Sequence, residues 1–129
     1  MNILAVKLLN ITIAIWSAYM MVLNATSTAD FLGVEYEVVI VIGGVLSGVY
    51  GLHVLFSLFR HQNNSLELTY FAFCDAGWIL ATAALLLLGF ITTTKGIVVS
   101  LIIALMVTYF GVNYLFEARR IKSTGDAHG

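Results

Sequence analysis

The sequence has no proline, a single cysteine and few charged residues. Charged residues make up 10% of the 129-residue chain, whereas a soluble domain carries about 25%. Without proline, the usual cause of a sharp helix kink is missing. Cys74 has no partner for an intrachain disulfide. The net charge of −1 gives no indication of the basic surface that nucleic-acid binding requires, so we expect no nucleic-acid partner.

What the sequence does contain is long uncharged stretches. Hydrophobic residues make up 60% of the chain. Four stretches are long enough for the roughly 20 residues that a helix needs to cross a bilayer, and only Asp75 interrupts any of them. Because lipid offers no hydrogen bonds, such segments must be helices or closed barrels, and the alternation of barrel strands is missing. The sequence predicts an all-α integral membrane four-helix bundle, a single domain over residues 1–129, with helices at about 4–24, 37–59, 68–91 and 96–117.

The short connections and the basic residues predict a topology. With an up-down-up-down arrangement and the N-terminus inside, five basic residues lie on the cytoplasmic side and Lys95 alone lies on the other. The five are Lys7, Arg60, Arg119, Arg120 and Lys122. The positive-inside rule therefore predicts that both termini are cytoplasmic. We expect a multi-pass protein of a prokaryotic plasma membrane, with a small polar tail at 118–129 that is frayed.

Small residues recur at helical spacing in the second and fourth predicted helices. The second carries Gly44, Ser47, Gly48 and Gly51, and the fourth carries Ser100, Ala104 and Gly111. Such residues let helix backbones approach closely in a membrane. Two interpretations stay open: packing within one bundle, which we favour, and a seam between copies of the chain or with another membrane protein.

Asp75 is the residue that a lipid-spanning helix should not carry without a reason, because a carboxylate there costs a few kcal/mol. If the second and third helices form a hairpin with its apex near Asn64, His53 and Asp75 lie at equal distance from that apex. We therefore predict that the two side chains pair. A wider polar cluster is predicted at a similar depth, consisting of Asn10, His53, Asp75, Tyr109 and Asn113.

The predicted pair supports three hypotheses. It could be a structural hydrogen bond that fixes helix register, which we favour, a proton relay or ion site, or part of a ligand site. His53 is the only histidine within a predicted span, so no haem or metal cofactor is expected.

The sequence shows no nucleophile elbow, phosphate loop or metalloprotease helix, so an enzyme is the less favoured hypothesis. Arg60, Asn64 and Glu67 do match the Arg-x-x-x-Asn-x-x-Glu spacing of membrane-associated glutathione-handling enzymes. In that family the motif follows the first helix, whereas two helices precede it here. The resemblance covers eight residues and implies at most a site for lipophilic or thiol substrates at the cytoplasmic mouth.

The function that the sequence favours is an interaction or accessory subunit whose surroundings are the lipid bilayer. The alternative is a minimal proton-linked transporter or channel that uses His53 and Asp75. The third hypothesis is the membrane enzyme at Arg60, Asn64 and Glu67. A cavity that reaches Asp75 would favour transport or ligand binding, whereas a dry core with exposed small-residue stripes would favour assembly.

Overall fold

The computed structural model describes residues 2–60 and 64–128, and within these ranges all regular structure is helical. The helices are α1 (Ile3–Ala18), the π-helical turn η1 (Tyr19–Leu23), α2 (Ala25–Leu32), α3 (Glu37–Ser57), α4 (Ser65–Leu87) and α5 (Thr94–His128). Four helical segments are long and apolar enough to cross a membrane: Ile3–Leu23, Glu37–Ser57, Ser65–Leu87 and Thr94–Ser123. The prediction of an all-α protein with four helices long and apolar enough to span a membrane is confirmed.

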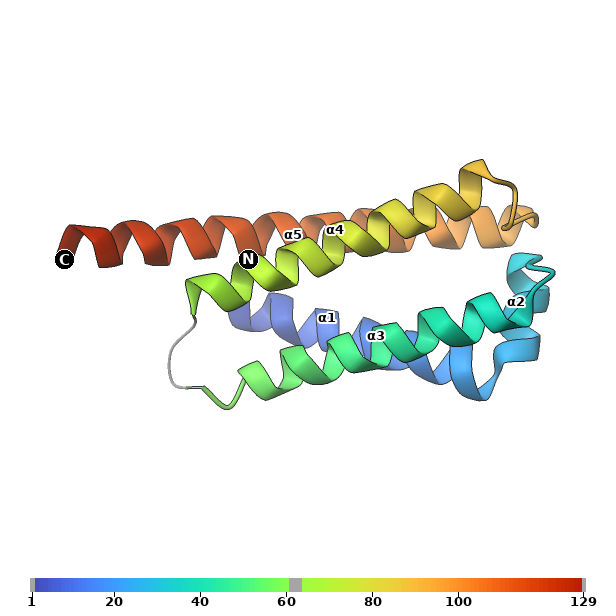
Figure 1. Cartoon of the computed structure of the whole chain (residues 1–129), viewed down its shortest axis with the longest axis horizontal. Coiled ribbons are helices and arrows are strands. Elements are labelled where there is room, and N and C mark those ends of the chain that lie inside the picture. The colour runs from blue at the N-terminus through green and yellow to red at the C-terminus, as the bar shows by residue number, and fades with distance from the viewer. Residues whose placement is uncertain (1, 61–63, 129) are drawn as a thin grey trace.

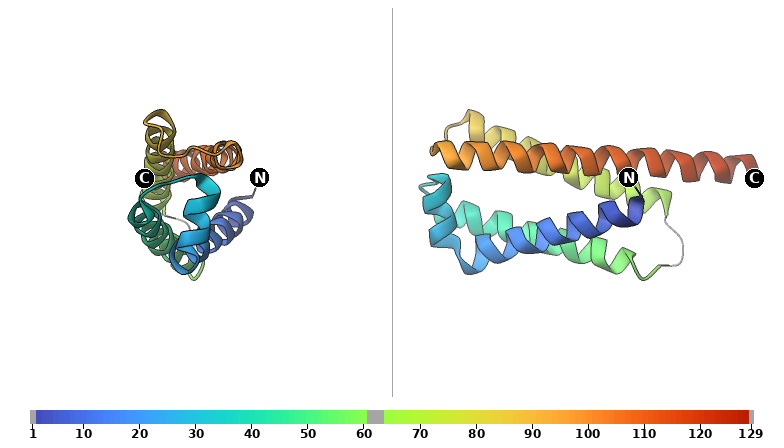
Figure 2. Two further views of the ribbon diagram at one scale, coloured as in Figure 1. Left: turned by 90° about the vertical axis from the view of Figure 1, so that its right-hand side faces the viewer. Right: turned by 180° about the vertical axis from the view of Figure 1, so that it is seen from behind.

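The helices associate as two pairs, as Figure 1 and Figure 2 show. α1 and η1 pack along α3, and α4 packs along α5. The N-terminus, the end of α3 and the C-terminal part of α5 lie at one end, and α2 lies at the other. Although α3 and α4 are consecutive, they are not among the helix pairs in extended contact in the described ranges. The expected α3–α4 hairpin packing is therefore wrong: each helix packs mainly against a different partner.

The small residues of α3 explain its choice of α1. A Cβ atom added to Gly44 would lie 2.8 Å from the Cβ of Met21, and one added to Gly51 would lie 3.0 Å from the Cβ of Ala14. The hydroxyl of Ser47 donates a hydrogen bond to the Ala14 carbonyl oxygen at 3.0 Å. Glycine is needed here because any side chain would hold the two backbones apart.

The small residues of α5 do not form one such stripe. A Cβ added to Gly111 would lie 3.5 Å from the Cβ of Asp75, so this glycine faces α4. Ser100 and Ala104 are half-buried. The core between α4 and α5 is instead built on large side chains, notably Phe71, Phe110 and Tyr114, which are almost completely buried.

The two pairs are joined at the end that holds α2. The backbone N–H of Thr92 donates to the Leu32 carbonyl oxygen at 3.0 Å, and the Thr92 hydroxyl donates to the Gly33 carbonyl oxygen at 2.8 Å. Gly33 ends α2 with φ 72°, a left-handed conformation that glycine adopts without strain. The sequence predicted only a connection at 25–36, and the structure differs because α2 forms there and holds the loop before α5.

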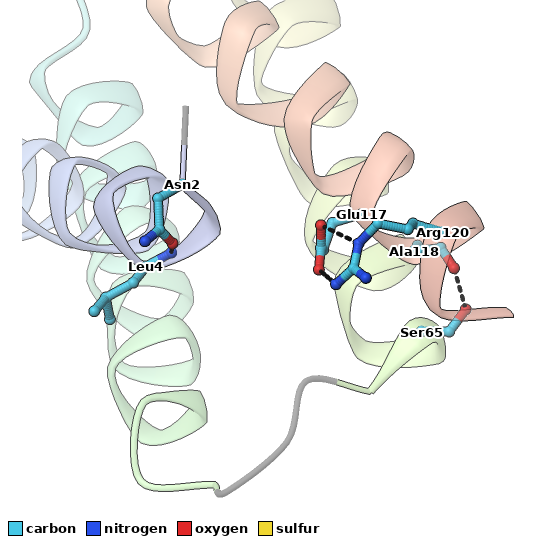
Figure 3. A network of polar contacts seen from close by, with 6 residues as sticks. All are labelled: Asn2, Leu4, Ser65, Glu117, Ala118 and Arg120. Carbon is cyan, nitrogen blue, oxygen red and sulfur yellow. Dashed lines mark hydrogen bonds and ion pairs between the residues drawn. The ribbon is translucent and has the colours of Figure 1, made fainter. Parts of the chain in front are cut away.

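At the opposite end, single polar contacts tie neighbouring helices together. Arg60 and Glu67 form an ion pair, with Nη1 and Oε2 3.0 Å apart, between the end of α3 and the start of α4. Figure 3 shows the Ser65 hydroxyl donating to the Ala118 carbonyl oxygen at 3.1 Å, which links α4 to α5. The same figure shows the Asn2 side chain accepting from the Leu4 N–H at 2.9 Å, which caps the start of α1.

The C-terminal segment differs from the expected frayed tail, because α5 continues through His128. Glu117 and Arg120 form an ion pair one helical turn apart, with Arg120 Nε 3.1 Å from Glu117 Oε2 (Figure 3). Such pairs support an exposed helix. No proline interrupts the segment, and α5 therefore extends beyond the rest of the bundle (Figure 1).

Candidate intramembrane site

One polar residue from each membrane-spanning segment contributes to a buried cluster, which we call the polar cluster: Asn10, Tyr50, Asp75 and Tyr114. The amide nitrogen of Asn10 donates to the hydroxyl oxygens of Tyr50 at 3.0 Å and Tyr114 at 2.9 Å. The Tyr50 hydroxyl lies 3.3 Å from the Phe71 carbonyl oxygen, to which it donates. A single asparagine thus links α1 to α3 and α5.

Asp75 completes this cluster from α4 but is not fully paired. Its side chain is buried, with the residue 2% exposed. Tyr50 and Asn10 are its polar neighbours, and its Oδ2 atom has no hydrogen-bond partner among the described residues. An unsatisfied buried polar atom costs about 1–3 kcal/mol, more when charged. Asp75 therefore keeps one strong acceptor open in the interior of the bundle.

Asp75 is among the residues that line a large cavity between the two helix pairs. This cavity, which we call the membrane cleft, has a volume of about 1080 Å³. Its polar end includes Asn10, Tyr50 and Asp75, together with Cys74 and Trp78. Its other end reaches α2 and the loop before α5, at Phe31, Leu32 and Ile91. Aliphatic and aromatic side chains line most of the wall between these ends.

The membrane cleft is open at the side, between α3 and α4. Two of its lining residues on α3, Leu46 and Val49, are 62% and 49% exposed, and Tyr70 on α4 is 47% exposed. Gly77 also lines it, and a Cβ added there would meet nothing within 4 Å. The opening follows from the pairing of the helices, because α3 turns its small residues to α1 and α4 turns its buried face to α5. In a bilayer this opening would face lipid chains.

The structure brings together only part of the predicted polar set. Asn10 and Asp75 lie in the polar cluster. His53 is exposed, with its ring edge-on to Tyr70 at a centroid distance of 6.1 Å, and it lines the same cleft. No hydrogen bond or ion pair joins His53 to Asp75 in the part of the chain that the structure describes. The predicted pair assumed close packing of α3 on α4, whereas these two helices meet through individual side chains, such as Tyr50 with Phe71 and His53 with Tyr70.

Tyr109 and Asn113 also lie outside the polar cluster. Tyr109 is 45% exposed, and the Asn113 amide donates to the Tyr109 carbonyl oxygen at 2.8 Å, one turn back on its own helix. The polar residue that α5 contributes is Tyr114 instead. The sequence signal that could have identified Tyr114 is its helical spacing from Val107, Gly111 and Ala118, which are all buried. Residues three, four and seven apart share one face of a helix.

The predicted mouth site is a separate and shallower feature. Arg60, Asn64 and Glu67 line a pocket of about 570 Å³ with Leu66, Thr69, Tyr70 and Phe73. Arg60 and Glu67 form an ion pair through Oε2, while Oε1 of Glu67 has no hydrogen-bond partner among the described residues. The Asn64 side chain caps α4 by accepting from the Leu66 N–H at 2.8 Å. These contacts give each of the three residues a structural role.

Among the described residues, no group of three or more His, Cys, Asp or Glu side chains could hold a metal ion. Comparisons with protein-family models, curated proteins and solved structures find no match to this chain. The function is therefore inferred from the geometry of the membrane cleft and the polar cluster.

Proposed function

We propose that this protein binds a lipophilic molecule within the membrane, in the membrane cleft, with Asp75 as the polar anchor. The observation that carries the proposal is an apolar cleft of about 1080 Å³ whose lining includes a buried carboxylate with one unpaired oxygen. Small-molecule sites are typically apolar cavities of roughly 300–1,000 Å³ with a few placed polar groups. The lateral opening would let a ligand enter from the bilayer.

The ligand-binding proposal is better supported than the accessory-subunit hypothesis. An assembly surface would require small-residue stripes that are open to another chain. The stripe on α3 is occupied by α1, since Gly44, Gly48 and Gly51 all face residues of α1 or η1 within 3.3 Å of an added Cβ. An accessory role would then depend on the bound molecule rather than on this stripe.

Transport is a second candidate, and the length of the membrane cleft favours it. The cleft extends from Asp75 to Leu32 and Ile91 at the end that holds α2. A ligand held in it would have a path along much of the bundle. Flux of the bound molecule in reconstituted vesicles, lost on Asp75→Asn, would raise transport above simple binding.

The orientation that we propose for this function is up-down-up-down with both termini in the cytoplasm. It is supported by basic residues that follow α3, at Arg60, or belong to the C-terminal part of α5, at Arg119 and Lys122. The end of α3 and the C-terminal part of α5 lie at the end that holds both termini (Figure 1), and basic residues favour the cytoplasmic side. On a Cys74→Ser background, Ser123→Cys should resist an impermeant maleimide in intact cells and react after lysis. Labelling in intact cells would contradict the orientation.

The binding proposal can be tested with the protein's own cysteine. Cys74 is half-buried and lines the membrane cleft, so an occupant should protect it from N-ethylmaleimide. In lipid nanodiscs, 1-dodecanol should slow alkylation of Cys74 in the unmodified chain. Gly77→Phe, which places a ring in the cleft, should remove the concentration-dependent protection.

The matched control is Ala76→Phe. Ala76 is exposed, does not line the cleft, and adjoins Gly77 on α4. It should retain protection by dodecanol. If the unmodified chain shows no protection by any dodecyl compound, or if both phenylalanine variants behave alike, the cleft is not a binding site.

A further inference from the structure

The polar cluster leaves one buried acceptor, Oδ2 of Asp75, without a hydrogen-bond partner among the described residues. Asn10 uses both hydrogens of its amide on the two tyrosine hydroxyl oxygens, and an amide has only two. The Tyr50 hydroxyl has one hydrogen, and the Phe71 carbonyl oxygen and the Asp75 carboxyl are both within its reach. The Tyr114 hydroxyl also has one hydrogen, but neither tyrosine hydroxyl forms a hydrogen bond with Oδ2 of Asp75 among the described residues. A ligand group that pairs with Oδ2 would therefore bring a donor of its own.

The lining of the cleft supplies no fixed positive charge to meet Asp75. None of the residues that line it is a lysine or an arginine. Lys7, one turn before Asn10, is outside the lining and interacts electrostatically with Glu67 and Arg60. His53 lines the cleft, with its ring against Tyr70, and forms no hydrogen bond or ion pair with Asp75 among the described residues. A positively charged group could therefore reach Asp75 without repulsion from a lysine or arginine in the wall.

We infer that, if the proposed binding function holds, the ligand is a lipophilic amine whose protonated nitrogen donates a hydrogen bond to Asp75. An ammonium group supplies both the missing donor and the opposite charge. Either charge alone is costly in the membrane, whereas the pair is less so. Trp78, which lies one helical turn beyond Asp75 and lines the cleft, adds an aromatic ring, a surface that attracts cations.

The remainder of the ligand must be an apolar chain. Leu85 lines the cleft ten residues beyond Asp75 on α4, which corresponds to about 15 Å at the helical rise per residue. Most of the wall along this path is aliphatic or aromatic. A dodecyl chain is a suitable probe of this shape, and changing only its polar end isolates the contribution of Asp75.

The test compares four dodecyl compounds in the same nanodiscs: dodecylamine, dodecyltrimethylammonium, 1-dodecanol and dodecanoate. Protection of Cys74 from N-ethylmaleimide gives the apparent affinity of each. We expect dodecylamine to bind about 10- to 100-fold more tightly than dodecanol, the range for a hydrogen bond to a charged group. Dodecyltrimethylammonium, which has the charge but no N–H donor, should be intermediate, and dodecanoate should be weakest because it repels Asp75.

Asp75→Asn should bring the affinity of dodecylamine down to that of dodecanol and leave dodecanol unchanged. Asp75→Glu, which keeps the carboxylate, should retain part of the preference for the amine. The headgroup comparison on the unmodified chain requires no variant, so it decides the matter even if Asp75→Asn does not fold.

Two failures of this experiment can be told apart. If dodecanol or dodecanoate binds as tightly as dodecylamine, or if Asp75→Asn keeps the amine preference, the amine inference is wrong while the binding proposal stands. If none of the four compounds protects Cys74, the proposed binding function itself is wrong.

Discussion

The two faces of α3 differ in how closely they are packed. One face meets α1 through Gly44, Ser47 and Gly51, where an added Cβ at either glycine would come within 3.0 Å of a neighbour. The other face carries Leu46 and Val49 into the open side of the membrane cleft. The small residues of α3 therefore determine that it packs closely against α1. Although α3 and α4 are consecutive in the sequence, each packs mainly against another helix, α3 against α1 and α4 against α5.

The largest effect should come from filling the closely packed face. Gly44→Leu should destabilise the fold by about 1–3 kcal/mol or prevent folding, because the Cβ atom alone would lie 2.8 Å from Met21. Gly48→Leu, with its added Cβ 3.3 Å from Ala18, should cost less. Thermal unfolding in detergent would measure both.

Val45→Leu is the control for this series, because Val45 lies between these glycines and is 50% exposed. It should unfold like the unmodified chain. If Gly44→Leu also unfolds like the unmodified chain, α1 and α3 are not packed as described.

The next effect concerns the polar link between the two halves. Asn10→Leu removes the donor to both tyrosine hydroxyls and should destabilise by about 1–3 kcal/mol, because it leaves buried polar groups without partners. Combined with Tyr114→Phe, the loss should be smaller than the sum of the single losses, since the two residues are in contact. Additive losses would show that the Asn10–Tyr114 hydrogen bond does not form.

His53 and Asp75 should behave differently from that coupled pair. Among the described residues no hydrogen bond or ion pair joins them, so the effects of His53→Ala and Asp75→Asn on stability should add to within about 0.5 kcal/mol. A double-variant cycle measured by chemical unfolding would decide the matter. Coupling well above that value would restore the direct pair that the sequence predicted.

The smallest effect on stability should come from filling the open face. Gly77→Phe should change the free energy of unfolding by no more than about 0.5 kcal/mol, as for a surface substitution, because an added Cβ there meets nothing within 4 Å. A thermal shift as large as that of Gly44→Leu would mean that the cleft is closed in the membrane.

The number of spans and their approximate bounds could be predicted from sequence because charge is expensive in lipid, so Lys7, Arg60 and Lys95 had to lie at helix ends. The small residues of α3 could be recognised as a packing surface because small side chains let helix backbones approach closely in a membrane. The partner of each face could not be predicted. The spacing of Gly44 and Gly51 specifies a close neighbour but not whether that neighbour is α1 or α4.

The candidate site was predictable only in part for the same reason. Asp75 and Asn10 could be selected because polar side chains within a span need partners. The rotation of each helix decides which polar residue of a span points inward, and it favours Tyr114 over Asn113 and Tyr109. The membrane cleft was not predictable, because it results from the separation of α3 from α4 and no residue in either helix encodes that separation alone.

The most direct test of the account is a solid-state NMR distance between the ¹³C-labelled carboxyl carbon of Asp75 and the ¹⁵N atom of labelled dodecylamine in lipid. The account predicts that the two nuclei lie within about 4 Å, the separation of a hydrogen-bonded ion pair. It also predicts that Gly77→Phe abolishes this contact and that Ala76→Phe does not. A protein that binds the amine without dipolar coupling to Asp75 would contradict the role of this carboxylate in the membrane cleft.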